Sequence, residues 1–154
     1  YNGVVATEDK LLVTDFDARN LHLYNRLDGK LMSSHGLESR PRGVCLISKT
    51  EVAVCLSDST IVILSFKSID DVKLVKTLNV KTGINSCDSV AKLNSDKLVV
   101  SGWKRREHMF YRCVVNLTDG RVDSTHKVCK GLFGVSVSQL AIKKDTVYIS
   151  CQTP

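Results

Sequence analysis

The residues best suited to binding chemistry form a short basic segment beside a tryptophan. Trp103, the only tryptophan of the chain, is followed by Lys104, Arg105 and Arg106, and His108 lies two positions further on. The indole ring could stack on a nucleobase or on a partner's side chain while the cations hold phosphate groups. Alternatively, Trp103 packs between structural units and the cations form a solvated hairpin tip. The residue types allow both interpretations.

The sequence lacks the motifs of the common catalytic sites. It contains no GxSxG, no HExxH, no phosphate-binding loop and no glycine-rich dinucleotide fingerprint. Its four histidines are scattered, and their spacing implies no acid partner for general base catalysis. We therefore expect no catalytic residue, no metal site and no cofactor, and we interpret the chain as non-enzymatic.

The six cysteines do not have the spacing of a zinc site. No CxxC pair occurs, and no histidine lies at ligand spacing from a cysteine. Most of the cysteines lie in apolar runs such as 43–47 and 52–55, where cysteine commonly behaves as a small buried hydrophobe. We expect free thiols in a reducing compartment, and with no recognisable signal peptide the expected location is cytoplasmic.

Composition and charge describe a folded protein. It has 154 residues, 43% of them hydrophobic and 25% charged, which excludes intrinsic disorder. The longest apolar runs fall far short of the roughly 20 residues that cross a bilayer, so no membrane partner is expected. The net charge of +6 is modestly basic, and its meaning depends on where the cations lie in the fold.

The elements that must position these residues are short strands that recur along the sequence. An apolar run, a polar turn and a second apolar run begin at residues 3, 43, 89 and 138, and the second run starts nine positions after the first in every copy. Third and fourth runs follow three of these pairs. Periods of 40 to 50 residues with this layout predict four-stranded antiparallel meanders, the blades of a β-propeller.

The predicted fold is therefore all-β, with about three and a half propeller blades. The protein forms one partial propeller over residues 1–154, with repeats at 1–40, 41–83, 84–133 and 134–154, the last of them truncated. Sustained helical periodicity is absent. An open partial ring leaves sheet faces and strand edges exposed, so we expect the remaining blades to come from the same longer chain or from another copy.

The first repeat resembles the NHL repeat. The segment 11–31 reads LLVTDFDARNLHLYNRLDGKL, an apolar strand, an Asp-rich turn, a second apolar strand and an Asp-Gly-Lys turn, and 40–44 is similar to the Pro-x-Gly-Val start of the next NHL blade. The resemblance is best over residues 1–66, and 103–108 replaces the Asp-rich turn in the third repeat. It implies a six-bladed ring and, in animals, the C-terminal part of a tripartite-motif protein.

Loops after the second and fourth strands share one face of a propeller, and that face is expected to be basic. The leading hypothesis is recognition of a protein partner there, including as the substrate-recognition part of a tripartite-motif ubiquitin ligase whose catalytic modules lie outside these residues. One alternative is an RNA-binding propeller on the same face. Another is an extracellular propeller of the YWTD type or a propeller hydrolase. The candidate binding residues are Arg19, Arg40, Arg42, Trp103, Lys104, Arg105, Arg106 and His108.

Overall fold

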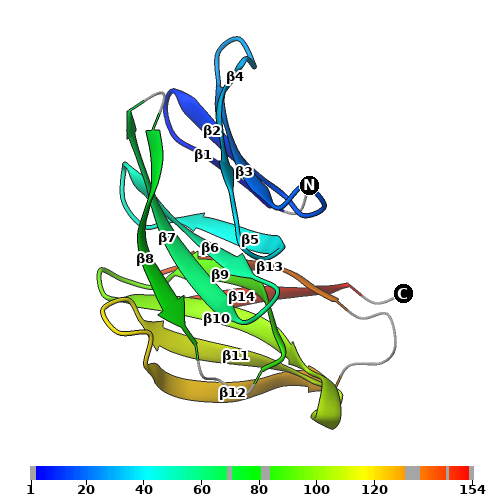
Figure 1. Cartoon of the computed structure of the whole chain (residues 1–154). Coiled ribbons are helices and arrows are strands. Elements are labelled where there is room, and N and C mark those ends of the chain that lie inside the picture. Colours follow the sequence, from blue (N-terminus) through cyan, green and yellow to red (C-terminus); the bar gives the residue numbers. More distant parts are fainter. Residues whose placement is uncertain (1–2, 69–70, 81–83, 131–135, 145, 153–154) are drawn as a thin grey trace.

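The protein folds almost entirely into antiparallel β-strands. The computed structural model describes residues 3–68, 71–80, 84–130, 136–144 and 146–152. Over these residues, strands pair only with their neighbours in sequence, which gives three four-stranded sheets and one two-stranded sheet (Figure 1). This confirms the predicted all-β fold of four-stranded meanders. We call the sheets blades 1 to 4 in sequence order.

The strand bounds follow the predicted repeat closely. Blade 1 holds β1 (Gly3–Ala6), β2 (Lys10–Asp15), β3 (Asn20–Asn25) and β4 (Leu31–Gly36). Blade 2 holds β5 (Pro41–Leu46), β6 (Glu51–Leu56), β7 (Thr60–Ser68) and β8 (Asp71–Asn79). Blade 3 holds β9 (Ser86–Lys92), β10 (Lys97–Lys104), the 3-10 turn η1 (Arg105–Glu107), β11 (Met109–Asn116) and β12 (Val122–Lys130). Blade 4 holds β13 (Ser136–Lys143) and β14 (Thr146–Gln152).

The first strands of the blades form the inner side of the assembly. Strand β1 packs beside β5, β5 beside β9 and β9 beside β13. Figure 1 shows the sheets following one another from the blue blade to the yellow blade, with β13 beside β9. The expected repeat boundaries at 83 and 133 lie outside the described residues.

Blade 2 buries apolar side chains on both faces because blade 1 covers one face and blade 3 the other. On β6, Val52 and Val54 point into a core shared with Leu12, Leu21 and Leu23 of blade 1. The alternate residues of β6 point the other way, toward blade 3. Strands buried on both faces read as continuous apolar runs, which explains the sequence of residues 52–56.

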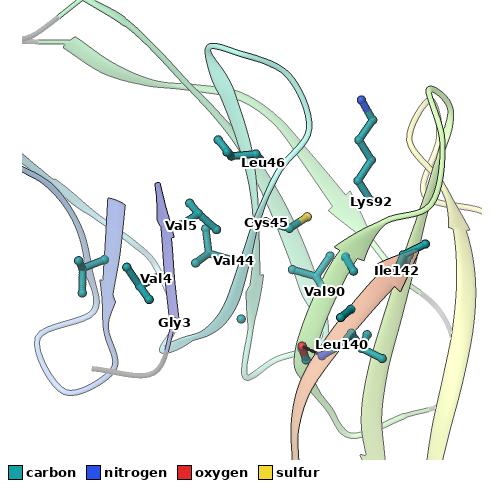
Figure 2. A pocket seen from close by; sticks show the side chains of 15 residues that line it. Gly3, Val4, Val5, Val44, Cys45, Leu46, Val90, Lys92, Leu140 and Ile142 are labelled. Carbon is teal, nitrogen blue, oxygen red and sulfur yellow. Dashed lines mark hydrogen bonds between the residues drawn. The ribbon is translucent and has the colours of Figure 1, made fainter. Parts of the chain in front are cut away.

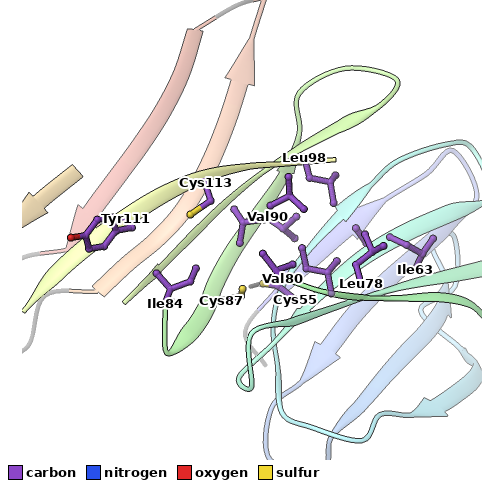
Figure 3. Packing of buried hydrophobic residues seen from close by; sticks show 14 residues of the cluster. Cys55, Ile63, Leu78, Val80, Ile84, Cys87, Val90, Leu98, Tyr111 and Cys113 are labelled. Carbon is purple, nitrogen blue, oxygen red and sulfur yellow. The ribbon is translucent and has the colours of Figure 1, made fainter. Parts of the chain in front are cut away.

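The second core lies between blades 2 and 3 and contains three buried cysteines (Figure 3). Cys55, Cys87 and Cys113 pack there with Ile63, Leu78, Val90 and Leu98. Cys55 and Cys87 are fully buried free thiols, and burial raises the pKa of Cys55 to about 12. Cys45 and Cys113 are free as well, whereas the side chains of Cys129 and Cys151 lie outside the described part.

Two glycines mark places where neighbouring strands approach too closely for a side chain. A Cβ on Gly43 would lie 2.8 Å from Ser89 Cα on β9. A Cβ on Gly102 would lie 2.0 Å from the carbonyl oxygen of Ser86, at a bulge between β9 and β10. Beyond the bulge, Trp103 still pairs with Ser86 and Phe110, and Lys104 with Met109, so both belong to β10 and only the residues after them form the loop. No helix among the described residues is long and apolar enough to span a membrane.

Candidate binding face at the loop end of the blades

Four described loops lie at one end of the blades. In an antiparallel meander the connections after the second and fourth strands share one end of the sheet. These connections are 16–19, 37–40, 57–59 and 105–108, and we call the surface they form the loop face. Figure 1 shows it on the right, with η1 at the lower right. It carries all the candidate binding residues or lies directly beside them.

Two arginines lie over one phenylalanine ring on the loop face. The guanidinium carbon of Arg40 is 5.0 Å from the centroid of the Phe16 ring, and that of Arg42 is 5.3 Å from it. At these distances the ring attracts both cations and restricts their orientation. Arg42 also forms an ion pair with Asp88 of blade 3, with 3.1 Å between Nη1 and Oδ1. We call Phe16, Arg40, Arg42 and Asp88 the arginine cluster.

Local hydrogen bonds hold the loops that carry this cluster. The carboxylate of Asp15 accepts the N–H groups of Asp17 at 3.1 Å and Ala18 at 2.9 Å. These bonds, the bond from Ala18 first, keep the pKa of Asp15 below its ordinary value. The N–H of Leu37 donates to the carbonyl of Arg19 at 2.8 Å, which ties the β4–β5 loop to the β2–β3 loop.

Asp88 is a largely buried carboxylate with two partners. Its side chain is 13% exposed, and burial raises its pKa, while the Arg42 guanidinium and a hydrogen bond from Ser86 act in the opposite direction. The Arg42 side chain is 37% exposed, yet its Nε is buried and has no hydrogen-bond partner in the described structure. The ion pair therefore leaves part of the Arg42 fork unused.

Trp103 packs within blade 3. Its ring lies 4.7 Å from that of Phe110 at a tilt of 53° and meets the His108 ring edge-on at 6.1 Å. Its backbone carbonyl accepts the N–H of Asn85 at 2.8 Å. The indole is half-buried in these contacts.

Glu107 in η1 interacts with two lysines and a tyrosine at this corner of blade 3. It pairs with Lys104 and accepts the hydroxyl of Tyr111, and Lys127 Nζ lies 4.0 Å from it. Lys104 also lies over the Tyr111 ring, 5.5 Å from its centroid. The hydrogen bonds from Lys104 and Tyr111 lower the pKa of Glu107, and the bond to Glu107 raises the pKa of Tyr111 to about 12. We call Trp103, Lys104, Glu107, Tyr111 and Lys127 the blade-3 corner.

The predicted binding residues thus separate into two clusters. Arg40 and Arg42 belong to the arginine cluster, while Trp103, Lys104 and His108 lie at the blade-3 corner. Arg19 and Arg106 are exposed on their loops, and the side chain of Arg105 lies outside the described part. Sequence reasoning missed Phe16 and Tyr111 as binding-face residues, and it did not pair Arg42 with Asp88 or Lys104 with Glu107. A usable signal existed only for Phe16, a large aromatic directly after a buried strand.

A groove of about 650 Å³ runs along the inner strands (Figure 2). Strands β1, β5, β9 and β13 line it, and Lys92 contributes its one long cation, whose ammonium donates to the carbonyl of Ile47 at 2.5 Å. Among the residues that the structure describes, no group of three or more His, Cys, Asp or Glu side chains is arranged to hold a metal ion.

Comparison with known proteins shows the fold and no more. No protein family and no curated protein matches the sequence. The β-propeller domain of Cps50 (Swd1) from Myceliophteria thermophila is similar in structure, with a TM-score of 0.71 and 12% identity over 98% of this chain and 49% of that chain.

Two further solved structures are similar at the same level. The computationally designed protein Ika8 has a TM-score of 0.66 and 13% identity over 96% of this chain and 42% of its own. A functionally unknown protein from Desulfotomaculum acetoxidans DSM 771 has a TM-score of 0.67 and 14% identity over 89% of this chain and 41% of its own. The protein described here therefore spans less than half the length of these three similar proteins.

Proposed function

We propose that these residues are part of a non-catalytic recognition module that binds a protein partner through its loop face. Propellers commonly serve as interaction domains, and rigid scaffolds present binding residues on loops. The observation that supports this face over the other is the arginine cluster, where Arg40 and Arg42 lie over Phe16. Arginine beside an aromatic ring is the composition enriched at protein interfaces.

We further propose an NHL-type propeller of a tripartite-motif protein as the context of this module. Asp15 supports the resemblance, because its carboxylate caps the Asp-rich turn through the N–H groups of Asp17 and Ala18. In this proposal the module selects substrates in the cytoplasm for ubiquitination, and the ligase chemistry lies in modules outside these residues. The free thiols of Cys45, Cys55, Cys87 and Cys113 are consistent with a reducing compartment.

Site-specific photocrosslinking tests the partner and the face together. A photoreactive phenylalanine analogue replaces Ala18 or Arg106 on the loop face of the full-length protein, or Lys30 or Lys49 on the opposite face, in the cells that normally contain it. All four side chains are exposed. We expect discrete protein adducts from positions 18 or 106 and none from positions 30 and 49. Adducts confined to the opposite face, or no protein adduct at all, would contradict the proposal.

RNA binding is the second candidate, favoured by the cations of the blade-3 corner. Lys104, Lys127 and the exposed Arg106 lie there with Glu107 as their acidic neighbour. Binding through phosphates predicts an affinity that falls steeply with salt. A salt titration of single-stranded RNA on the full-length protein and on its Arg106→Gln variant measures this. An absent shift, or a shift independent of salt, excludes the candidate.

A further inference from the structure

The arginine cluster presents hydrogen-bond donors that the protein itself does not use. Within the described residues, the Arg40 guanidinium contacts the Phe16 ring and makes no hydrogen bond or ion pair. Arg42 gives one contact to Asp88, while its buried Nε has no partner in the described structure. Two guanidinium groups are therefore positioned by the same ring with most of their donors free.

This arrangement of two guanidinium groups is suited to binding an oxyanion. A planar guanidinium matches the two oxygens of a carboxylate in a bidentate pair, and an aromatic ring beneath it reduces the freedom lost on binding. A buried donor without an acceptor is uncommon in folded proteins and requires an explanation. The Nε of Arg42 is enclosed by the protein and out of a partner's reach, so the donors open to a partner are the Arg40 guanidinium and the terminal Nη groups of Arg42.

The charges around the cluster restrict what that partner can be. Three exposed carboxylates, those of Asp17, Glu38 and Asp58, lie on the loops around the arginine pair. Asp17 follows Phe16, and Glu38 precedes Arg40 by two positions. Asp58 follows Ser57, whose backbone N–H donates to the Arg40 carbonyl at 2.9 Å. A polyanion such as RNA would be repelled by them, whereas a single carboxylate between cations would meet opposite charge at every position.

We propose that Arg40 and Arg42 together bind one carboxylate of the protein partner, flanked in the partner by Lys or Arg residues that face Asp17, Glu38 and Asp58. The carboxylate belongs to an Asp or Glu side chain or to the partner's own carboxyl terminus. This inference rests on the proposed function and deepens it by naming the partner's chemistry. The ring of Phe16 restricts the orientation of both guanidinium groups that would bind this carboxylate.

The proposal can be tested by selecting peptides that bind the full-length protein from a random library displayed on phage. We expect the selected peptides to share one Asp, one Glu or a free C-terminal carboxylate with Lys or Arg nearby. Synthetic versions with Asn or Gln at that position, or with an amidated C-terminus, identify the source of the carboxylate. We expect loss of the carboxylate to weaken binding about tenfold or more.

Matched variants locate the contact. Arg40→Gln should weaken the selected peptide about tenfold, and Arg40→Lys should recover only part of the loss because lysine lacks the planar fork. Lys49→Gln removes an exposed cation from the opposite face and should leave affinity unchanged. Equal binding by Arg40→Gln, or selected peptides without a carboxylate or with several adjacent ones, would overturn the inference. Protein adducts at position 18 in that case would leave the proposed function intact, so the two failures are distinguishable.

Discussion

Three residues share an unusual backbone conformation at the same place in three blades. Arg19, Ser59 and His108 each directly precede the third strand of a blade, and their φ angles are 56°, 68° and 51°. Left-handed backbone is unfavourable for any residue with a Cβ, and glycine is the usual choice. The sequence carries no sign of this conformation because none of the three is glycine. The loop face is thus built on turns that carry backbone strain.

Replacement of Arg19 isolates the cost of that strain. The Arg19 side chain is exposed and φ is 56°, so Arg19→Gly should relieve the unfavourable backbone. We expect the free energy of unfolding of Arg19→Gly to be about 0.5–1 kcal/mol higher than that of Arg19→Ala. Arg19→Ala is the control, because it removes the charge but keeps the Cβ. Urea denaturation of both variants measures the difference. Equal midpoints would mean that the turn relaxes without cost.

The hydrogen bond between Tyr111 and Glu107 should give stability a defined pH window. Because the pKa of Glu107 is lowered in the folded protein, its carboxylate stabilises the fold fully at pH values above the ordinary glutamate pKa. This stabilisation is lost as the pH falls through the lowered pKa. The raised pKa of Tyr111 makes its contribution present below pH 10 and lost as pH rises toward about 12. The stability difference between wild type and Glu107→Gln, from urea midpoints across pH, should therefore be greatest between these limits. A difference independent of pH would contradict this assignment.

At the scale of elements, one turn occurs twice with the same hydrogen bonds. In blade 1 the side chain of Asn25 accepts the N–H of Leu27 at 2.8 Å, and Gly29 donates to the Asn25 carbonyl at 2.9 Å with φ of 69°. In blade 3 Asn116 and Gly120 repeat these bonds at 2.7 and 2.9 Å, with φ of 76°. Both turns contain an Asp-Gly pair, at 28–29 and 119–120, and glycine is suited to its position because only glycine takes this φ without strain.

The strands were predictable, and most contacts between blades were not. Alternation and turn residues are local properties, so residues 3–15 and 43–55 were predictable as hairpins, which β1 with β2 and β5 with β6 form. The registers of the two hairpins differ by one position, because Gly3 lies opposite Thr14 whereas Val44 lies opposite Val54 after a bulge. The ion pair of Arg42 with Asp88 joins residues 46 positions apart, and only the packing of blade 2 on blade 3 brings them together. Sequence reasoning therefore placed Arg40 and Arg42 on the loop face, while the pairing of Arg42 with Asp88 was missed.

Close packing of the inner strands predicts a large difference between two glycines. A Cβ on Gly43 would lie 2.8 Å from Ser89 Cα and 3.0 Å from Cys55 Sγ, so Gly43→Ala must push β5 away from β9. We expect a loss of about 1–3 kcal/mol in the free energy of unfolding. The control is Gly36→Ala, whose new Cβ would have 3.8 Å to its nearest neighbour, and it should be neutral or slightly stabilising. Equal urea midpoints for the two variants would contradict the close approach.

At the scale of the whole molecule, the ends of the blade array are open. Val4 lies opposite Val13 on the face of blade 1 that points away from blade 2, and it is 60% exposed. Tyr148 of β14 is 55% exposed, and β14 pairs only with β13 among the described residues. In blade 2, which is covered on both faces, the side chains on both faces are apolar and buried. The exposed apolar side chains at the ends of the array are of the same kind.

These open ends should make residues 1–154, produced alone, associate with themselves. Apolar faces and unpaired strand edges attract further strands, including those of another copy. Sedimentation velocity over a range of protein concentrations should show association that the double variant Val4→Lys with Tyr148→Lys reduces. Leu27→Lys is the control, because Leu27 is 89% exposed in the β3–β4 turn and lies on neither β1 nor β14. If Leu27→Lys reduced association as much as the double variant, the attraction would come from general surface hydrophobicity rather than from the open ends of the blade array.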